Sequence, residues 1–150
     1  MKNERKIKKR IIYEGFGFPI VFENVSMVRV RGDWTPDIDY NNIAKHVLNC
    51  LSQKPARLTG DEIRFIRHSF EMTLVEFAKR FSVTHPAVLK WEKSGCQTPS
   101  MNWPIEKDIR LAIVAYLRKT KTKFFEVYEK LKSEPKEKVK PICLDLSKAA

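Results

Sequence analysis

The chain has 150 residues, which is enough for one average domain or two small ones. Apolar residues make up 43% and charged residues 31%, so the composition allows a packed core and excludes wholesale disorder. The net charge of +11 indicates a polyanion such as nucleic acid, or an acidic protein, as partner. The charge lies at the ends, because residues 1–10 carry +5 and residues 119–150 carry +4, whereas residues 11–118 carry only +2.

Several classes of protein are excluded. No apolar run approaches the ~20 residues that a membrane span needs, and Glu14 interrupts the apolar region of any signal peptide. Cys50, Cys96 and Cys143 form no CxxC pair, so neither a disulfide framework nor a structural zinc site is indicated. His46 and Cys50 could share a metal, but helix packing is the favoured reading. With no catalytic motif either, we expect a cytoplasmic, non-enzymatic protein without metal or cofactor and without membrane contact.

The N-terminal third reads as a basic arm followed by a small β unit with a helix. Residues 1–10 are predicted to be a mobile arm, and residues 11–52 to be the β unit plus a bridging helix. The helix is expected over residues 40–51, where Ile43, Val47 and Leu51 form one apolar line. Predicted strands cover residues 11–13, 20–22 and 25–30.

The last of these strands has a period-two pattern. Met27, Arg29 and Arg31 alternate with Val28 and Val30, which predicts one charged face. The exposed edges of such short strands can pair with another chain. We therefore take Val28, Arg29, Val30 and Arg31 as candidate partner-binding residues.

Residues 53–132 are predicted to form five short helices packed against each other. The fourth helix should turn Ile109, Leu111, Ala112, Ala115 and Tyr116 inward. The fifth should place Phe124, Phe125, Tyr128 and Leu131 in the core, with a dimer seam as the alternative. Residues 133–150 are expected to be a flexible tail apart from an apolar segment at 142–146. The helices are predicted at residues 60–70, 73–81, 85–93, 104–118 and 121–132.

Two of these helices have the spacing of a helix-turn-helix, in which the second helix enters the DNA major groove. Ala78 supplies the small residue that lets the helices cross closely, and Val83 supplies the apolar residue of the turn. Val88 and Trp91 are expected to face inward. The candidate DNA-binding residues are Thr73, Thr84, His85, Ala87, Lys90 and Lys93.

Residues 58–118 resemble the Xre/Cro-repressor type of helix-turn-helix domain. The resemblance implies that Arg67 pairs with Glu92 inside the domain. Glycine is common in that family where Glu71 and Ser82 stand, and Pro86 leaves open whether Thr84 or His85 caps the groove-facing helix. The matching residues are Ile63-Arg64-x-x-Arg67, Thr73-x-x-Glu76-Phe77-Ala78, Val83-Thr84 and Val88-x-x-Trp91-Glu92-Lys93.

The whole chain resembles the MqsA/YgiT-type antitoxins, in which a small zinc-binding β domain precedes an Xre-like domain. The resemblance implies autoregulation of an operon and neutralisation of an RNA-cleaving toxin. Residues 30–34 occupy the region where a zinc cysteine pair is expected, so the β unit is predicted to have lost its metal. The resemblance depends on Tyr13-Glu14, Pro19-x-Val21, Glu23-Asn24-Val25 and Lys54-Pro55-x-Arg57-Leu58-Thr59.

The sequence thus predicts a mostly α protein, in which a small β-hairpin unit and a bridging helix precede an Xre-like five-helix domain. The predicted function is a dimeric repressor that binds double-stranded operator DNA and, as the antitoxin of a type II toxin–antitoxin operon, neutralises an RNase-like toxin. Two alternatives stay open. One is a phage-type or host regulator without a toxin, and the other is an interaction or scaffold protein whose helix-turn-helix does not bind DNA.

Overall fold

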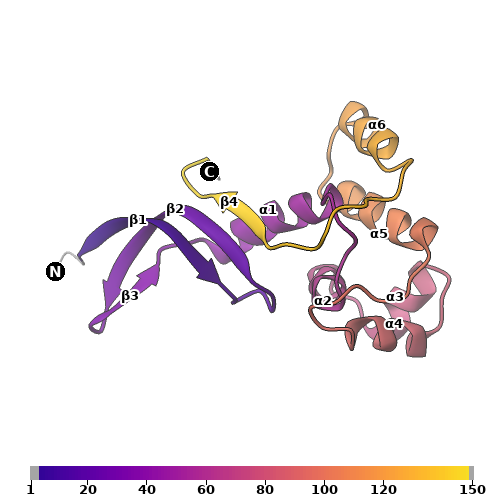
Figure 1. The fold of residues 1–150 in the computed structure, drawn as a ribbon, viewed down its shortest axis with the longest axis horizontal. Helices are drawn as coiled ribbons and strands as arrows, with labels where there is room; N and C mark the ends of the chain where they lie inside the picture. Colours follow the sequence, from indigo (N-terminus) through magenta and orange to yellow (C-terminus); the bar gives the residue numbers. More distant parts are fainter. Residues whose placement is uncertain (1–3, 149–150) are drawn as a thin grey trace. The chain divides into compact units, whose positions relative to one another are not determined.

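The computed structural model describes residues 4–148, which contain six α-helices and one four-stranded sheet (Figure 1). The chain divides into two compact units, described separately below. Of the described residues, 4–47 and 141–148 form the sheet unit and 48–140 form the helical unit. The fold is therefore mixed α/β, because the expected hairpin is part of a larger sheet.

The sheet is organised around its longest strand, β2 (Ile20–Val30). β1 (Arg5–Tyr13) pairs antiparallel with one side of β2. On the other side, β3 (Asp33–Pro36) pairs antiparallel and β4 (Ile142–Asp145) pairs parallel. Arg31 and Gly32 connect β2 to β3, both with positive φ, as a tight hairpin turn with right-handed strand twist requires.

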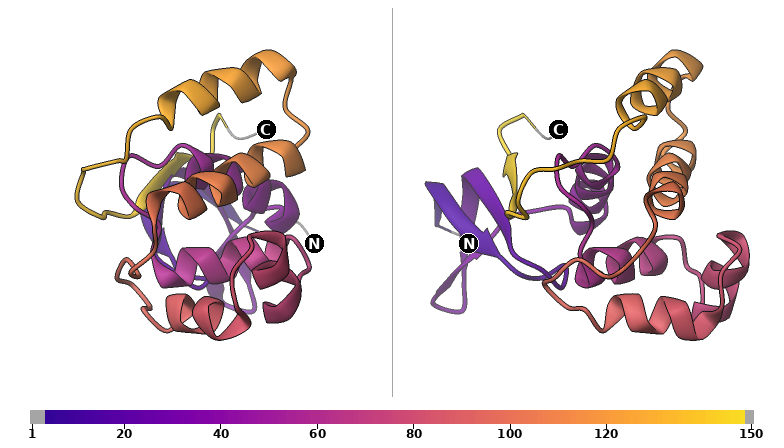
Figure 2. Two further views of the ribbon diagram at one scale, coloured as in Figure 1. Left: turned by 90° about the vertical axis from the view of Figure 1, so that its right-hand side faces the viewer. Right: turned by 45° about the vertical axis from the view of Figure 1, so that its right-hand side comes forward.

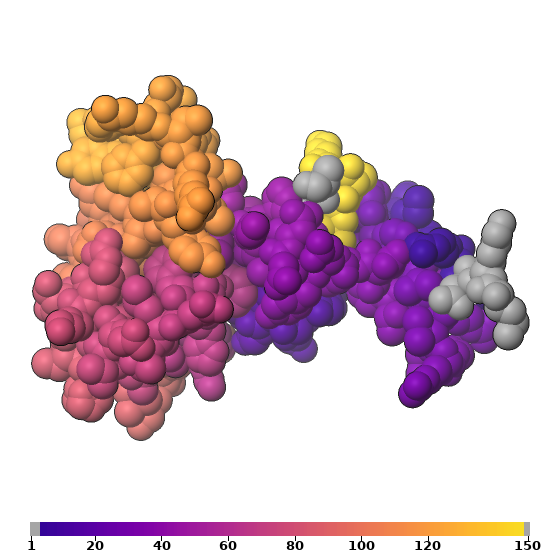
Figure 3. All heavy atoms as spheres, turned by 180° about the vertical axis from the view of Figure 1, so that it is seen from behind, coloured from indigo at the N-terminus to yellow at the C-terminus, as the bar shows by residue number. Residues whose placement is uncertain are grey.

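Both ends of the chain add strands that the sequence did not predict. Residues 5–10, expected in a mobile arm, belong to β1, because β2 continues far enough to pair with them up to Arg5↔Val28. In the expected tail, β4 lies beside the start of β2, and Leu146 N donates to Glu23 O at 2.9 Å. The space-filling view shows this C-terminal segment against the strands (Figure 3). Residues 1–3 and 149–150 of these two predictions lie outside the described residues.

Asn24 changes the alternation along β2. Its φ of 54° is left-handed, and the fully buried Phe22 before it is followed by buried Val25 and Met27 after it. Val21 is buried as well, so the first three residues of β2 are all buried, whereas after Asn24 only the alternate residues Val25 and Met27 are. The predicted faces are therefore wrong at two places, because Met27 is 5% exposed and Val30 is 44% exposed.

Helix α1 (Tyr40–Ser52) begins in the sheet unit and ends in the helical unit. Asp39 accepts from Asn42 N at 3.4 Å, so its side chain caps the first turn. Phe16, in the turn between β1 and β2, stacks on Tyr40 with ring centroids 4.7 Å apart. The buried Ile43 and Val47 confirm the apolar line expected for this helix.

The helical unit contains five further helices, as the sequence predicted. α6 (Lys121–Lys130) packs against α5 (Trp103–Tyr116) through a small core of Val114, Val127 and Leu131 (Figure 2). In the described residues, 4–148, no helix is long and apolar enough to cross a membrane. The helices are α2 (Gly60–Ser69), α3 (Leu74–Arg80), α4 (His85–Glu92), α5 (Trp103–Tyr116) and α6 (Lys121–Lys130).

The inward faces of α5 and α6 differ from the predicted ones. Ala115 and Tyr116 are exposed, because the helix turns Ile113 and Val114 inward together with the charged Arg110 and Glu106. On α6, Phe125 is 55% exposed and Tyr128 is 39% exposed, so neither lies in the core. Tyr128 is instead covered on one face by the Lys107 ammonium, 4.5 Å from the ring centroid.

A buried charged cluster fixes the segment before α2 onto α5. Arg110 is fully buried and bonds to Glu106 Oε2 and to the carbonyl oxygens of Lys54 and Ala56. Burial lowers the pKa of Arg110, and the Glu106 carboxylate opposes that shift. Arg57 reaches the same carboxylate at 2.8 Å. Every charge in this cluster has a partner, as burial demands.

Candidate nucleic-acid interface

Helices α3 and α4 are joined by residues 81–84 and begin with side-chain caps. Thr73 and Glu76 form the predicted capping box at the start of α3. At the start of α4, Thr84 Oγ1 accepts from Ala87 N at 3.3 Å, so Thr84 and not His85 is the cap. Pro86 falls in the first turn of α4, where the missing N–H has no helical partner to lose.

The connection between α3 and α4 is tight. Ser82 has a φ of 57°, which allows Val83 N to donate to Ala78 O at 2.9 Å. Ala78 is 3% exposed, as expected of a small residue where helices cross closely. Glu71, before α3, has a similar φ of 55°. Glu71 and Ser82 therefore both have a left-handed backbone, in which glycine would be the unstrained residue.

A charged pair fixes the end of α4 onto α2. Arg67 donates from Nε to Glu92 Oε2 at 3.0 Å and from Nη2 to Glu92 Oε1 at 2.8 Å. Arg67 Nη1 also donates to Met72 O, at 3.1 Å, in the turn before α3. The predicted Arg67–Glu92 pair is confirmed, and one guanidinium connects α2, the following turn and α4.

The predicted DNA-binding residues lie on α4 or cap its ends, except Thr73, which caps α3. Val88 is fully buried and Trp91 is 5% exposed, so these two anchor the inner side as expected. Among the predicted DNA-binding residues only Ala87 is half-buried. The others, all exposed, are Thr73, Thr84, His85, Lys90 and Lys93.

Leu89 also lies on the outward side and was missed by the sequence interpretation. It is 40% exposed although it is a large apolar residue. The sequence could have predicted this exposure, because successive residues of a helix are about 100° apart and Leu89 follows the buried Val88. An exposed leucine beside Lys90 supplies an apolar contact of the kind that a thymine methyl group accepts.

The charges on this surface are available to a ligand. Within residues 4–148, neither Lys90 nor Lys93 forms an ion pair, and Lys79 at the end of α3 is exposed without one as well. The free amides and the positive end of the α4 dipole lie at Thr84. Chemically, this surface can donate hydrogen bonds and attract anions.

Of the predicted partner-binding residues, Val28, Arg29 and Val30 lie on the central strand β2, and Arg31 lies in the turn that leads to β3. Val28 pairs with Arg5 on one side and Thr35 on the other, and Arg29 pairs with Trp34. Because β2 has neighbours on both sides at Val28 and Arg29, these two residues have no free edge for another strand. Arg29 is further engaged by Glu4 at 3.2 Å. Val28 and Arg29 can therefore meet a partner only through a face of the sheet.

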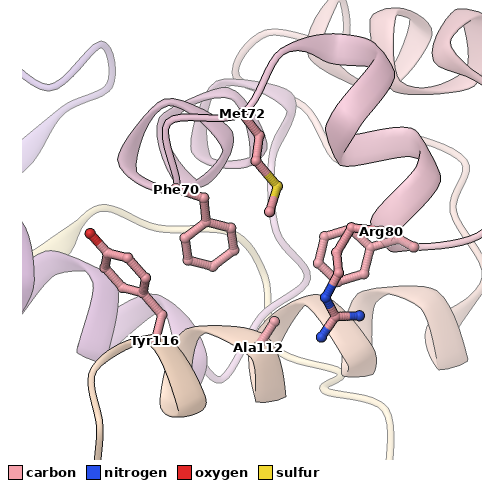
Figure 4. A pocket seen from close by; sticks show the side chains of 6 residues that line it. Phe70, Met72, Arg80, Ala112 and Tyr116 are labelled. Carbon is pink, nitrogen blue, oxygen red and sulfur yellow. The ribbon is translucent and has the colours of Figure 1, made fainter.

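A pocket of about 180 Å³ lies elsewhere in the helical unit (Figure 4). Phe70 and Tyr116 form one side, with ring centroids 5.0 Å apart, and the Arg80 guanidinium supplies the charge. No residue of α4 lines it, and its lining offers no acid–base pair. The six lining residues are Phe70, Met72, Arg80, Phe81, Ala112 and Tyr116.

In the described part of the chain, no three His, Cys, Asp or Glu side chains gather closely enough to hold a metal ion. His46 and Cys50 on α1 thus lack a third ligand there. Burial raises the pKa of the Cys50 thiol, which favours its protonated form. No protein-family model, curated protein or solved structure matches the chain.

Proposed function

We propose that the protein is a sequence-specific DNA-binding transcriptional repressor that places α4 in the major groove. The main support for this proposal is that α4 has two different sides. Buried Val88 and Trp91, together with the Arg67–Glu92 pair, anchor one side, and the other side is exposed and basic. With α3 and the four-residue connection, this arrangement supports a helix-turn-helix of the Xre type. A major groove about 12 Å wide accepts one such helix.

The exposed residues divide into two roles. Lys90 and His85, on the outward side of α4, are placed to contact base edges, with Leu89 against a thymine methyl group. Lys93 and the caps Thr73 and Thr84 are placed to contact phosphates, which fixes the orientation of the helix on the duplex. Base contacts by α4 then provide the sequence specificity, and base and phosphate contacts together provide the affinity for DNA.

The test compares a duplex from the region upstream of the protein's own coding sequence with a random duplex of equal length. Specific, salt-dependent binding is expected, and Lys90→Ala should weaken the specific complex by roughly 1–3 kcal/mol. Lys119→Ala, at an exposed position after α5, is the matched control and should change affinity little. Equal affinity for both duplexes would favour an interaction or scaffold protein that does not bind DNA.

Homodimerisation is part of the proposal. A dimer presents two copies of α4, which requires half-sites about one helical turn apart in a palindromic operator. The exposed Phe125 on α6 is the residue that such a seam would bury. A footprint covering a single half-site at saturation would argue for a monomeric regulator.

The second candidate is the antitoxin role, in which the protein also neutralises a toxin. The separate sheet unit favours it, because a compact unit beyond α2–α6 is not needed to bind a groove. The full chain should rescue cells that express the neighbouring gene, and Lys90→Ala should rescue equally while failing to repress. A neighbouring gene without toxicity would indicate a phage-type or host regulator without a toxin.

A further inference from the structure

The outer edge of β1 is free to accept another strand. β1 pairs with β2 from Arg5↔Val28 to Tyr13↔Ile20, and no other part of residues 4–148 pairs with it. Arg29 N donates to Glu4 O at 3.0 Å, so the backbone N–H and C=O groups of Glu4 point toward β2. By the alternation of an antiparallel ladder, the backbone N–H and C=O groups of Arg5 and Ile7 then point to the free edge.

This edge is strongly basic. Residues 5–10 are all exposed, and every residue except Ile7 is positively charged. Arg5 pairs with Asp37, and the Lys6 ammonium lies 4.2 Å from the centroid of the Trp34 ring. Across the described residues, Lys8, Lys9 and Arg10 form no ion pair. Their charges are therefore available to a partner.

Two large apolar side chains flank these charges. Ile7 is 76% exposed and Ile12 is 69% exposed, the highest values among the large exposed apolar residues of the described chain. Nucleic-acid phosphates would meet the basic groups but would leave both isoleucines and the free backbone groups in water. A second β1 strand would place like charges opposite each other, which is unfavourable. An acidic peptide strand satisfies the charges, the backbone groups and the isoleucines together.

We propose that the free edge of β1 binds an extended, acidic segment of a partner protein as an additional strand. Carboxylates of the partner face Lys8, Lys9 and Arg10, and apolar residues of the partner cover Ile7 and Ile12. The proposal deepens the partner-binding part of the proposed function, and it does not depend on DNA binding by α4. It moves the partner site from the central strand β2 to the outer strand β1.

The test uses the full chain and a fluorescent peptide whose glutamates are spaced to face the basic residues of β1 and whose valines face Ile7 and Ile12. Fluorescence anisotropy should show binding that weakens with salt. Lys8→Glu/Lys9→Glu should reduce affinity by at least about tenfold, because repulsion replaces attraction. Lys136→Glu/Lys138→Glu changes the net charge equally at exposed positions and should leave affinity nearly unchanged.

Backbone pairing is tested separately at Ile7. Ile7→Pro removes an N–H that points to the free edge, which an edge strand tolerates, so the fold should persist by circular dichroism while peptide binding is lost. Ile7→Val keeps both the N–H and an apolar side chain and should retain most of the affinity. Equal weakening by both substitutions would mean that contact with the peptide does not use the edge and would overturn the proposal.

Nucleic acid is the competing outcome. Absence of peptide binding, together with loss of random-duplex binding in Lys8→Glu/Lys9→Glu but not in Lys136→Glu/Lys138→Glu, would assign β1 to phosphates and overturn the proposal. Failure of the wild-type chain to distinguish its own upstream duplex from random DNA would instead contradict the repressor function. The two failures are thus separable, since the first concerns β1 and the second concerns α4.

Discussion

The guanidinium of Arg67 and the carboxylate of Glu92 form two hydrogen bonds, at 2.8 and 3.0 Å, between α2 and the last residue of α4. The side chains are 12% and 7% exposed, so each would be a poorly solvated charge without the other. Because Arg67 also holds Met72 O, the pair sets the position of α4 relative to the turn before α3. The proposed DNA-contacting side of α4 is thereby oriented by a residue that lies on another helix.

Arg67→Met should destabilise the protein by about 3 kcal/mol, because it leaves the Glu92 carboxylate buried without its main partner. The double variant Arg67→Met/Glu92→Leu should lose less than the sum of the two single variants, because no unpaired charge remains. Urea denaturation measures both. Additive losses would show that the two side chains do not interact in solution.

Ser82→Gly should stabilise the protein by up to about 1 kcal/mol. A left-handed residue other than glycine costs about 1–2 kcal/mol, and the greater freedom of glycine in the unfolded chain offsets part of that gain. Glu71→Gly should behave in the same way, since its φ is 55°. Ser94→Gly is the matched control and should destabilise, because Ser94 does not have a positive φ. The melting temperature should therefore rise in Ser82→Gly and Glu71→Gly and fall in Ser94→Gly.

The helical half was largely predictable because its signals are local. The capping box of Thr73 and Glu76 and the inward pair Val88 and Trp91 follow from spacings of three or four residues. The Arg67–Glu92 pair came from a family resemblance, since no local pattern joins residues so far apart. The face of α5 was misjudged because two of its buried residues, Glu106 and Arg110, are charged.

The sheet was less predictable for two physical reasons. Residues 5–10 lack apolar alternation, and only pairing with the far end of β2 makes them a strand. β4 is parallel to β2 and more than a hundred residues away, so nothing near Ile142 in the sequence indicates its partner. The left-handed Asn24 also interrupts β2 midway, and the residues buried after it are Val25 and Met27 rather than the Val28 and Val30 that the period-two pattern favours.

Gly60→Ala should destabilise the helical unit by roughly 1–3 kcal/mol. A Cβ at this position would lie 2.4 Å from Trp91 O and 2.8 Å from Gly95 N, and both are backbone atoms that cannot rotate away. Gly60 also begins α2, so the clash would push α2 from the end of α4. Chemical denaturation should show the loss, and specific DNA binding should weaken with it. An unchanged midpoint would mean that the start of α2 and the end of α4 do not approach this closely in solution.

Cysteine reactivity tests the pairing of β4 with β2. Cys143 Sγ donates to Glu23 Oε1 at 2.9 Å, and this hydrogen bond raises the pKa of the thiol. Less thiolate is then present at pH 8 than without this hydrogen bond, so Cys143, although exposed, should react slowly with a disulfide reagent. Glu23→Gln removes the negative charge, lowers the pKa of Cys143 and should increase its labelling rate several-fold.

Cys96 serves as the internal control in the same sample, because its rate should not respond to Glu23→Gln. The difference in Cys143 labelling between wild type and variant should shrink as the pH rises through the pKa of Cys143, because Cys143 is then a thiolate in both proteins. Mass spectrometry of labelled peptides assigns each rate to its cysteine. Equal Cys143 rates in the two proteins at pH 8 would mean that the C-terminal strand does not hold Cys143 beside Glu23 in solution.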